Sequence, residues 1–287
     1  MPRQTVAAVI PTKNAGRVIG GALASLRFCD EIIVVDMNST DDTRAVCDRF
    51  PSVRFFTRQD YIYGNFNFGV EQASSNWIIR LDSDERLTPE LAREIVALLE
   101  EGPTADVYEA PFTSYFLGHP IRWGAAWEQP RRKTLFRKGT LRYKVQSEHE
   151  DLTPAARPVT VARLRGRYVH FSTPDVATFL RKINYYSDRD YARAVPQRIR
   201  VLPPWRLMWS VPRYFAHQYV VCRGYRDGYA GFALCALNAV YRLVHELKAW
   251  ECRNDLKVHH ERVREAFDSS LSHSERDPAK REVEGAG

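Results

Sequence analysis

The sequence of 287 residues lacks the cysteine pattern by which disulfide frameworks and many metal sites are recognised. Its five cysteines do not have the spacing of metal ligands, and an odd number does not suit a framework of disulfide bonds. They are Cys29, Cys47, Cys222, Cys235 and Cys252. The segment after Met1 also lacks the basic and then apolar stretch of a secretory signal peptide. We therefore expect a reducing, cytoplasmic setting and no secretion by that route.

Glycine-rich loops and long apolar runs are missing as well. No Gly-x-Gly-x-x-Gly follows the first predicted strand, and no glycine-rich phosphate loop with a lysine occurs, which argues against the common dinucleotide-binding and P-loop classes. The stretch Gly228–Tyr241 has 14 residues without a charge, fewer than the roughly 20 that a membrane-spanning helix requires. No internal repeat is visible. A globular protein remains, and its binding site must be built from other residues.

Charges of the two signs are unevenly distributed along the chain. The formal net charge is +7, yet residues 1–120 hold 11 Lys and Arg against 17 Asp and Glu, a net charge of −6, which leaves +13 for the rest. An acidic first part suits a site that depends on a cation. A basic second part suits phosphate groups, a membrane surface or nucleic acid. We therefore expect the two parts of the chain to meet different partners.

Apolar segments of strand-like composition alternate with helical patterns in the first third of the chain. Strands are predicted over residues 5–10, 31–36, 53–56 and 77–81, and helices over 18–26, 41–50 and 65–73. This alternation is a run of βαβ units, which forms an open, mostly parallel sheet with helices on both faces. Three loops then share the carboxyl edge of the sheet, where α/β proteins bind ligands: residues 11–14, 36–42 and 82–85.

Two carboxylates, Asp82 and Asp84, follow the last of these strands. Because they are two residues apart, both can present oxygen to one hard cation, directly or through water. Thr88 and Pro89 offer another explanation, since they begin a helix as N-cap and first residue, and acids near a helix start are stabilising on their own account. The residues alone leave both explanations open.

The middle of the chain is basic and contains interleaved aromatic residues. Between residues 121 and 147 only Glu128 opposes a set of basic side chains: Arg122, Arg131, Arg132, Lys133, Arg137, Lys138, Arg142 and Lys144. Trp123, Trp127 and Tyr143 can stack on a sugar ring or cover an edge of the core. Arginine clusters bind phosphate wherever it occurs, so nucleotide sugars and phosphorylated lipids fit this segment better than nucleic acid does. We predict no nucleic-acid partner.

A second acidic group lies at residues 148–151, and His170 follows it. A loop carboxylate opposite a bound donor can take a proton from an attacking hydroxyl, whereas the same side chains can also be solvated charges. Neutral imidazole near a strand end is a competent metal ligand, whereas a lone histidine can equally have a structural partner. Taken alone, the residues do not choose between these readings.

From Pro174 onward the pattern becomes helical and basic. Residues 181–226 hold 10 Lys and Arg against 2 Asp, mixed with tryptophans such as Trp205 and Trp209, which is the composition of a helix at a membrane interface. We expect Pro196, Pro203, Pro204 and Pro212 to divide it into short helices. A buried helical hairpin, or an interface in a homo-oligomer, is the alternative. Beyond about Phe267 the composition predicts a disordered tail.

Three motifs at the shared edge resemble those of a known family: Ile10–Asn14 (IPTKN), Val35–Thr43 (VDMNSTDDT) and Leu81–Glu85 (LDSDE). In order and spacing they are similar to the nucleotide-sugar half of a family 2 glycosyltransferase of GT-A fold. Shorter motifs are similar to the branch that adds glucose to the inner core of lipopolysaccharide: Tyr115–Gly118, Leu135–Gly139, His149-Glu150 and His170–Ser172. The resemblance covers about residues 5–252.

The resemblance implies a donor site on the first half of the chain. In the family, the residues that match Pro11–Asn14 line the nucleoside, and the residue that matches Asp36 contacts the base or the ribose. The predicted nucleotide-sugar-binding residues are Pro11, Thr12, Asn14, Asp36, Asn67, Arg80, Asp82 and Arg132. The chain departs from the family at Ala15, where Glu is common, and at Phe66, where Lys or Arg is common. A diphosphate contact is then missing or supplied from elsewhere, for which Arg80, Arg131 and Arg132 are candidates.

The same resemblance implies a metal ion and a base. It makes Asp84 the direct ligand of Mg²⁺ or Mn²⁺, with Asp82 as an indirect ligand or a ribose contact, and His170 as a further ligand of the metal or the diphosphate. A divalent cation that bridges diphosphate oxygens neutralises the charge of the leaving group without proton transfer. Glu150 of the His-Glu motif matches the base that an inverting transfer requires.

The predicted architecture has three parts. They are a GT-A catalytic domain over residues 1–172, a helical, basic extension over 173–267 that meets acceptor or membrane, and a tail over 268–287. The predicted function is inverting transfer of a hexose from a UDP-sugar to a hydroxyl of a glycolipid or saccharide, with the protein peripheral on the cytoplasmic face of an anionic membrane. Two alternatives are a nucleotidyltransferase, which would need a glycine-rich activating loop, and a GT-A module that binds without transfer.

Overall fold

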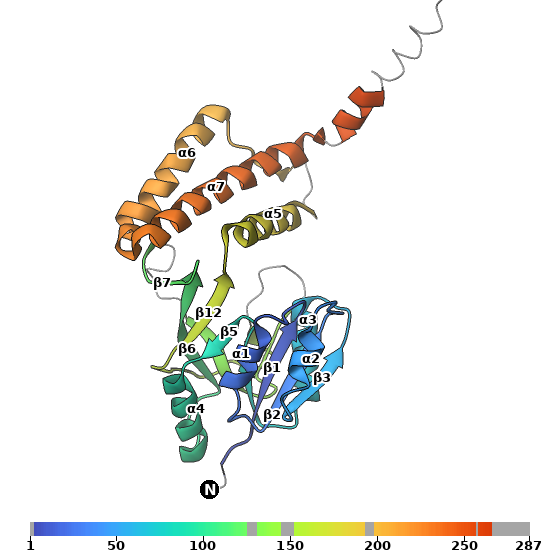
Figure 1. Ribbon diagram of the computed structural model, residues 1–287, viewed down its shortest axis with the longest axis vertical. Helices are drawn as coiled ribbons and strands as arrows, with labels where there is room; N and C mark the ends of the chain where they lie inside the picture. Colours follow the sequence, from blue (N-terminus) through green and yellow to red (C-terminus); the bar gives the residue numbers. More distant parts are fainter. Residues whose placement is uncertain (1–2, 125–130, 145–151, 193–197, 257, 266–287) are drawn as a thin grey trace, which may run out of the picture. The chain divides into compact units, whose positions relative to one another are not determined.

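The computed structural model describes residues 3–124, 131–144, 152–192, 198–256 and 258–265. Figure 1 shows a sheet flanked by helices in the first part of the chain and long helices in the last part. By its internal contacts the chain divides into two compact units, Met1–Phe179 with Phe215–Ala236, and Leu180–Tyr214 with Leu237–Gly287. The predicted class, an α/β fold with a helical C-terminal extension, is confirmed.

The first unit contains a ten-stranded sheet with the order β3-β2-β1-β4-β8-β6-β12-β5, in which β7 and β11 also pair with β6. Its first four strands are parallel: β1 (Val6–Thr12), β2 (Glu31–Asp36), β3 (Val53–Thr57) and β4 (Trp77–Arg80). The intervening helices are α1 (Ile19–Ser25), α2 (Thr43–Cys47) and α3 (Ile62–Gln72). The predicted βαβ alternation is therefore present.

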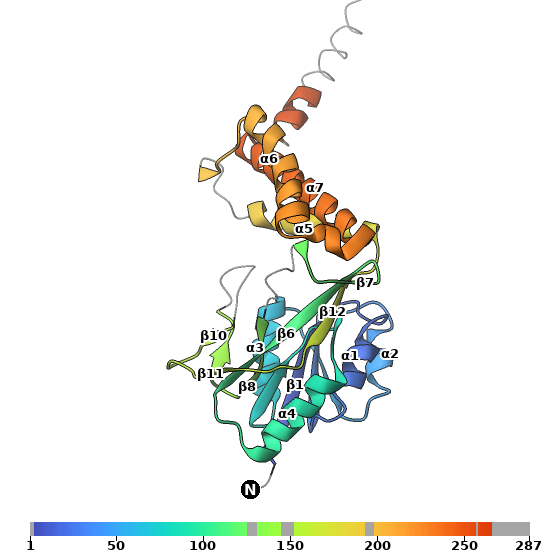
Figure 2. The same cartoon turned by 90° about the vertical axis from the view of Figure 1, so that its left-hand side faces the viewer.

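Alternate residues of β1 face the two sides of the sheet, as the pleat requires. Val6, Ala8 and Ile10 pack in one core with residues of α1 and of α4 (Pro89–Glu101), whereas Ala7 and Val9 pack in the other with residues of α3. Figure 2 shows α3 on one side of these strands and α1 and α2 on the other. Gly69 lets α3 approach closely, because a Cβ there would lie 2.5 Å from the Val9 side chain.

The remaining strands add an antiparallel step in the middle of the sheet. They are β5 (Glu85–Leu87), β6 (Val107–Phe116), β7 (His119–Ile121), β8 (Arg131–Arg137), β11 (Val161–Arg163) and β12 (Tyr168–Thr173). A separate pair consists of β9 (Leu141–Arg142) and β10 (Thr153–Pro154). β8 runs antiparallel to both β4 and β6, and β12 pairs with β6 in parallel and with β5 antiparallel. Residues far beyond the acidic motif are thereby brought beside it.

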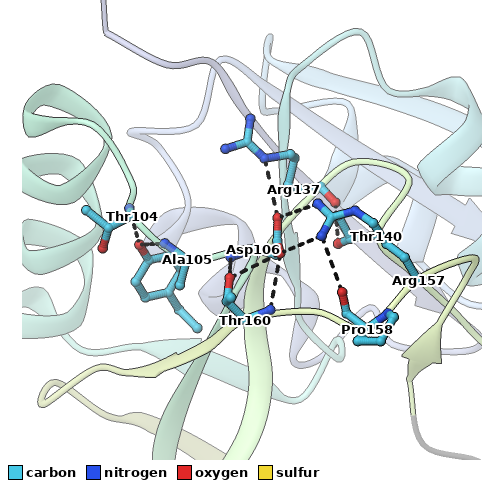
Figure 3. Close-up of polar contacts among 9 residues, drawn as sticks. Thr104, Ala105, Asp106, Arg137, Thr140, Arg157, Pro158 and Thr160 are labelled. Atoms are coloured by element: carbon cyan, nitrogen blue, oxygen red, sulfur yellow. Dashed lines mark hydrogen bonds and ion pairs between the residues drawn. The ribbon is translucent and has the colours of Figure 1, made fainter.

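A polar cluster around Asp106 ties β6, β8 and β11 together at the amino edge of β4 (Figure 3). The Asp106 carboxylate accepts hydrogen bonds from Arg157 (3.1 Å) and from the backbone N–H and hydroxyl of Thr160 (both 3.1 Å). Arg137, at the end of β8, lies 3.9 Å from the same carboxylate. Because β8 pairs Arg137 with Trp77, the cluster lies at the opposite end of β4 from Asp82 and Asp84. It is a structural junction, remote from the predicted site.

The segment Phe215–Ala236 packs within the first unit. It contains a π-helix, η3 (His217–Val221), a 3₁₀ helix, η4 (Gly224–Asp227), and the start of α7 (Gly228–Arg253). Asp227 accepts hydrogen bonds from the backbone N–H groups of Arg122 (3.1 Å) and Trp123 (2.8 Å). These bonds join the segment to the end of β7.

The second unit is helical and is held by polar contacts between α5 (Val176–Ala192) and α7. Lys248 donates to the Asn184 side chain (2.7 Å) and to Asp188 (2.6 Å). Helix α6 runs from Pro204 to Ala216 with Pro212 inside it. The expectation that Pro212 would end a helix is therefore wrong, because a proline removes only one helical hydrogen bond and the exposed Met208 turn can leave its carbonyl to water. In the described part of the chain, no helix combines the length and the apolarity needed to cross a membrane.

Candidate active site

Two loops meet at the carboxyl edge of β1 and β2 and are joined by hydrogen bonds. The backbone N–H of Asn14 donates to Ser39 Oγ (2.7 Å), and Asn14 Oδ1 accepts from the backbone N–H of Thr40 (2.8 Å). Both oxygens of Asp36 accept from Ser39, one from its backbone N–H at 2.9 Å and the other from its hydroxyl. Asn14 has a φ of 50°, a left-handed conformation that asparagine adopts more readily than most residues. Asn14 and Asp36 are thus brought together and held.

Pro11 and Thr12, which were expected in the loop, are the last two residues of β1. The strand continues because the ladder with β2 does: Thr12 pairs with Asp36, and the N–H of Met37 donates to the Thr12 carbonyl (2.8 Å). The Thr12 hydroxyl is buried and has no hydrogen-bond partner among the described residues. A buried hydroxyl without a partner carries a cost in free energy.

The acidic motif forms a tight turn between β4 and β5 that Glu85 closes from both sides. The backbone N–H of Asp82 donates to the Glu85 carboxylate (2.9 Å), and the backbone N–H of Glu85 donates to the Asp82 carbonyl (3.0 Å). Arg132 donates to the other carboxylate oxygen of Glu85 at 2.8 Å. The Glu85 side chain is completely buried, and its burial raises its pKa above the ordinary range for glutamate, with the Asp82 charge acting in the same direction and Arg80 and Arg132 opposing.

His170 lies beside this turn because β12 pairs with β5 and places His170 opposite Glu85. Its Nε2 is 3.3 Å from the Asp84 carboxylate, and the N–H of Phe171 donates to the Asp84 carbonyl (2.9 Å). Burial acts to lower the pKa of His170, but the hydrogen bond and charge of Asp84, with the charge of Glu85, outweigh it and raise the pKa. Two of the predicted metal ligands, Asp84 and His170, are therefore adjacent.

Asp82, the third predicted metal ligand, is paired with arginine. Arg80 Nη2 lies 3.1 and 2.8 Å from the two Asp82 oxygens, and Arg132 Nη1 lies 3.6 Å from one of them. The Arg132 guanidinium also lies over the Phe112 ring, 4.8 Å from its centroid. Asp82 is thus neutralised by two cations, while Asp84 faces an imidazole.

The side chains of Asp84 and His170 can bind a divalent cation whose other coordination positions are filled by a bound ligand or by water. Asp84 and His170 supply one carboxylate oxygen and one imidazole nitrogen at adjacent positions, a donor pair that suits Mn²⁺ and is acceptable to Mg²⁺. Within the described residues no group of three or more His, Cys, Asp or Glu side chains could hold a metal ion. Mg²⁺ in nucleotide sites usually keeps waters and takes phosphate oxygens, so two protein ligands are compatible with such a site.

The structure gives the other predicted donor residues definite partners. The Asn67 side chain is hydrogen-bonded at both of its polar atoms to the backbone of Tyr143, at 2.9 and 3.0 Å. Phe66, which replaces the expected basic residue, is fully buried and packs against Phe136 and Tyr143. Arg131 donates to the Leu164 carbonyl (3.0 Å). Which arginine side chain contacts the diphosphate of a donor therefore stays a prediction.

Glu150 and its neighbours Glu148, His149 and Asp151 lie outside the described residues, so the role of Glu150 as base also stays a prediction. The solvated-charge alternative is equally untested. Trp127 and Glu128 fall in another such segment.

Sequence reasoning missed two buried residues of this site, Glu85 and Tyr168. Tyr143, expected either to stack on a sugar ring or to cover an edge of the core, is buried and stacks on Tyr63. The sequence analysis treated Glu85 only as part of an acidic run. Glu85 and Leu87 occupy alternate positions and are both buried in β5, so the alternation of Glu85 with the apolar Leu87 was the sequence signal that could have marked it as internal. Tyr168 is 2% exposed, and its hydroxyl has no hydrogen-bond partner in the part of the chain that is described. Tyr168 stacks on the Phe112 ring, and the Arg132 guanidinium lies over the same ring. Tyr168 therefore packs beside the arginine that pairs with Glu85.

An α/β sheet whose parallel strands carry paired loops and an acidic turn at their carboxyl edge is expected to bind its ligand at that edge. The family model described as "Glycosyl transferase family 2" matches residues 7–159, a little over half of the chain. The chain belongs to glycosyl transferase family 2. Its function is glycosyl transfer, and both the fold and the family predicted from the motifs are confirmed.

Individual relatives agree with this assignment. The chain is 29% identical over 279 residues to the lipopolysaccharide core biosynthesis glycosyltransferase LpsC of Rhizobium meliloti (strain 1021), covering 95% of this chain and 100% of the relative. It is 32% identical over 113 residues, 36% of each chain, to a GalNAc(5)-diNAcBac-PP-undecaprenol beta-1,3-glucosyltransferase of Campylobacter jejuni. Among solved structures, the mannosyltransferase PcManGT of Pyrobaculum calidifontis, in complex with GDP-Man and Mn²⁺, matches with a TM-score of 0.52 and 14% identity over 86% of this chain and 87% of that one. The GT-A type of fold is thereby supported.

Proposed function

We propose that the protein is an inverting, cation-dependent hexosyltransferase that uses a UDP-sugar and acts on a hydroxyl of a phosphorylated glycolipid or saccharide, such as a lipopolysaccharide core. The observation that carries the proposal is the adjacent Asp84–His170 pair at the edge where the Asn14 and Asp36 loops meet. The name of the LpsC relative supports the acceptor class, and the Mn²⁺ and GDP-Man bound by PcManGT support a nucleotide sugar with a divalent cation.

The donor would lie along the carboxyl edge of β1, β2 and β4. In this proposal Pro11, Thr12 and Asn14 line the nucleoside, and Asp36 contacts the base or the ribose. The unpartnered Thr12 hydroxyl and the Asp36 carboxylate support this placement, because the first has no partner among the described residues and the second is held by Ser39. Asp82, held between Arg80 and Arg132, would contact the ribose or support the cation indirectly.

Asp84 and His170 would hold Mg²⁺ or Mn²⁺. When bound, the cation neutralises the charge that develops on the departing diphosphate. The chain's own residues keep this position in place, since Glu85 closes the turn and β12 carries His170 to it.

The transfer itself is a single displacement. The acceptor oxygen forms a bond to the anomeric carbon while the bond from that carbon to the diphosphate oxygen breaks, and the nucleoside diphosphate leaves with the electron pair. The acceptor proton passes to the carboxylate of Glu150, the residue proposed as general base. Attack opposite the leaving group inverts the anomeric configuration.

We further propose that helix α6 binds the cytoplasmic face of an anionic membrane. Trp205, Met208 and Trp209 are 61%, 64% and 67% exposed, and Arg206 and Arg213 on the same helix are exposed as well. Exposed tryptophans with arginines suit the boundary between headgroups and acyl chains. Phe215, in the last turn of the same helix, stacks on Tyr219 (5.3 Å between ring centroids). We also propose that the chain divides into domains at residues 172 and 267 and that it forms a homo-oligomer. The tail over 268–287 lies outside the described residues.

Donor turnover with and without a divalent cation tests the proposal. We expect release of UDP from a UDP-hexose, dependent on Mn²⁺ or Mg²⁺, and an inverted anomeric carbon in the product by NMR. Release of pyrophosphate from a nucleoside triphosphate and a sugar phosphate would instead identify a nucleotidyltransferase. Tight UDP-sugar binding with no turnover, when a lipopolysaccharide-core acceptor is supplied, would identify a module that only binds.

A further inference from the structure

Two guanidinium groups lie over one indole side chain just beyond the end of β7. The central carbon of the Arg226 guanidinium is 4.8 Å from the centroid of the Trp123 ring, and that of Arg223 is 5.7 Å from it. Both arginines are exposed, whereas Trp123 is half-buried. In the part of the chain that the structure describes, neither guanidinium has a carboxylate partner. Two like charges over one ring repel each other, and an anion between them would remove this repulsion.

The segment that carries these arginines is fixed to the first unit. Asp227 accepts a hydrogen bond from the backbone N–H of Trp123 (2.8 Å). Gly224 packs closely against α7, because a Cβ there would lie 2.7 Å from the sulfur of Cys235. Arg223 has a φ of 59°, a left-handed conformation that persists only where the surrounding structure fixes it. The two guanidiniums are therefore carried by a backbone that is held in place before any ligand binds.

The sheet register brings this arginine pair near the proposed metal position. Ser114 of β6 pairs with His170 of β12 on one side and with Ile121 of β7 on the other. Because neighbouring strands are about 4.8 Å apart, Ile121 lies about 10 Å from His170. Trp123 follows two residues later, which adds at most about 7 Å along the backbone. An acceptor of several sugar units with its attacking hydroxyl at the cation can extend this far.

We propose that Arg223 and Arg226 form an anion subsite for the acceptor, in which they bind a phosphate group on its saccharide. This inference rests on the proposed transfer to a phosphorylated acceptor. A guanidinium presents parallel N–H donors that match the oxygens of phosphate, and no carboxylate among the described residues competes for this pair. Membrane lipids are the other source of phosphate. The anchoring to β7, within the unit that contains the sheet, favours the saccharide.

Calorimetric titration with a deacylated, phosphorylated lipopolysaccharide-core oligosaccharide, in the presence of UDP and Mn²⁺, is the first test. The same oligosaccharide after removal of its phosphate is the comparison. We expect the wild type to bind the phosphorylated form more tightly by at least about 10-fold, because the bonds to phosphate are charge-assisted. Arg223→Gln with Arg226→Gln should remove this preference. Equal affinities in the wild type, or a preference that survives in the double variant, would overturn the inference.

Arg27→Gln with Arg44→Gln is the matched control. Both are exposed arginines that also lie over aromatic rings, Arg44 at 4.6 Å from the centroid of Phe55 and Arg27 at 5.9 Å from that of Phe50. The control removes the same charge and the same type of contact near α1 and α2. We expect it to keep the preference for the phosphorylated form. If it loses the preference as fully as the Arg223 and Arg226 variant does, net charge or destabilisation explains both losses and the subsite is refuted.

A second measurement uses the wild-type fold. The side-chain N–H signals of Arg223 and Arg226 in NMR spectra, assigned with the two single glutamine variants, should move when the phosphorylated oligosaccharide is added to the wild type. They should stay in place with the dephosphorylated form, as should the signals of Arg27 and Arg44 with either form. Signals of Arg223 and Arg226 that do not move would contradict the subsite, even if the double variant proves unstable.

Two further outcomes separate this inference from its neighbours. If the double variant loses binding to anionic vesicles and the wild type shows no preference for the phosphorylated oligosaccharide, the arginine pair binds lipid headgroups and the inference is overturned. A wild type that releases no UDP from a UDP-hexose, yet shows the preference, would refute the proposed transfer and support the saccharide subsite. Transfer with the same KM for phosphorylated and dephosphorylated acceptors would support the proposed function and refute the subsite.

Discussion

Asp82 and Asp84 are two residues apart and have different surroundings. Asp82 is paired with Arg80 and Arg132, whereas Asp84 lies beside His170. A carboxylate paired with two guanidiniums exchanges them for a metal less readily than a carboxylate beside one imidazole does. The two aspartates should therefore respond differently to substitution.

We predict that Asp84→Ala abolishes the cation-dependent part of donor binding and that Asp82→Ala only weakens it. At 100 times Kd a ligand stabilises the native state by about 2.7 kcal/mol, so UDP with Mn²⁺ should raise the unfolding temperature of the wild type by several degrees. The Mn²⁺-dependent part of this shift should be absent in Asp84→Ala. Asp48→Ala, which removes an exposed carboxylate directly after α2, is the control and should behave as the wild type. Equal shifts in Asp84→Ala and the wild type would remove the metal assignment.

At the proposed base, we predict that Glu150→Gln keeps donor affinity nearly unchanged and lowers kcat by at least ~100-fold, because the amide cannot accept a proton and general bases contribute 10²–10⁴-fold. Steady-state kinetics with UDP-sugar and acceptor give the measurement. Glu148→Gln and Asp151→Asn are isosteric neighbours for comparison. A large loss in either of them, in place of Glu150→Gln, would move the role to that residue.

At the scale of elements, the carboxylate of Glu31 holds the turn that precedes a strand of the sheet. Glu31, at the start of β2, accepts from the backbone N–H groups of Ser74 (2.7 Å) and Ser75 (2.8 Å) and from Arg54 (2.9 Å). These bonds hold the turn that leads into β4, the strand that carries the acidic motif. Burial acts to raise the pKa of Glu31, but the hydrogen bonds from Ser75, Ser74 and Arg54 outweigh it and hold the pKa below its ordinary value of 4.5.

This lowered pKa predicts a specific pH dependence of stability. The native state releases the Glu31 proton more readily than the unfolded chain, so its contribution is fully present above pH 4.5 and is lost as the pH falls through the native pKa. Glu31→Gln should lower the free energy of unfolding by about 1–3 kcal/mol at pH 7. The difference from wild type, measured by urea unfolding, should shrink at pH 4 and below. Glu71→Gln, a carboxylate of α3, is the control; a constant difference across pH would contradict the assignment.

At the scale of the whole molecule, the acidic motif and the exposed tryptophans of the sequence lie in different units of the structure. The acidic turn lies in the sheet of the first unit, whereas α6, with its exposed Trp205 and Trp209, lies mostly in the second. A catalytic sheet joined to a basic, aromatic helix suits an enzyme whose acceptor is embedded in a membrane.

We predict that α6 binds anionic vesicles and that salt weakens the binding. Each basic residue at the surface contributes about 1 kcal/mol, so reversing Arg206 and Arg213 to Glu should lower the partition coefficient by at least roughly 30-fold in co-sedimentation at low ionic strength. Arg44→Glu with Arg93→Glu, exposed arginines of α2 and α4, makes the same change in net charge elsewhere. Binding that ignores salt and both reversals would mean that α6 packs against protein, as in a homo-oligomer.

Local sequence was sufficient for the first four strands, for the three helices between them and for the position of the acidic turn, because apolar alternation and turn residues act over a few positions. It did not predict the strands from β5 to β12. The three edge motifs were also sufficient to find the family. Pro212 shows the limit of such rules, since α6 continues through it where the exposed turn accepts one missing hydrogen bond.

The tertiary structure decided which residues meet across long separations. His170 reaches Asp84 only because β12 pairs with β5, and Asn67 meets Tyr143 across 76 residues. Glu85 and Arg132, 47 residues apart, close the turn as a buried pair. Many carboxylates and arginines in the chain could form such a pair, and local pattern does not rank them. The choice follows from sheet order and register, because burial leaves each polar group only the partner that the neighbouring strand brings within reach.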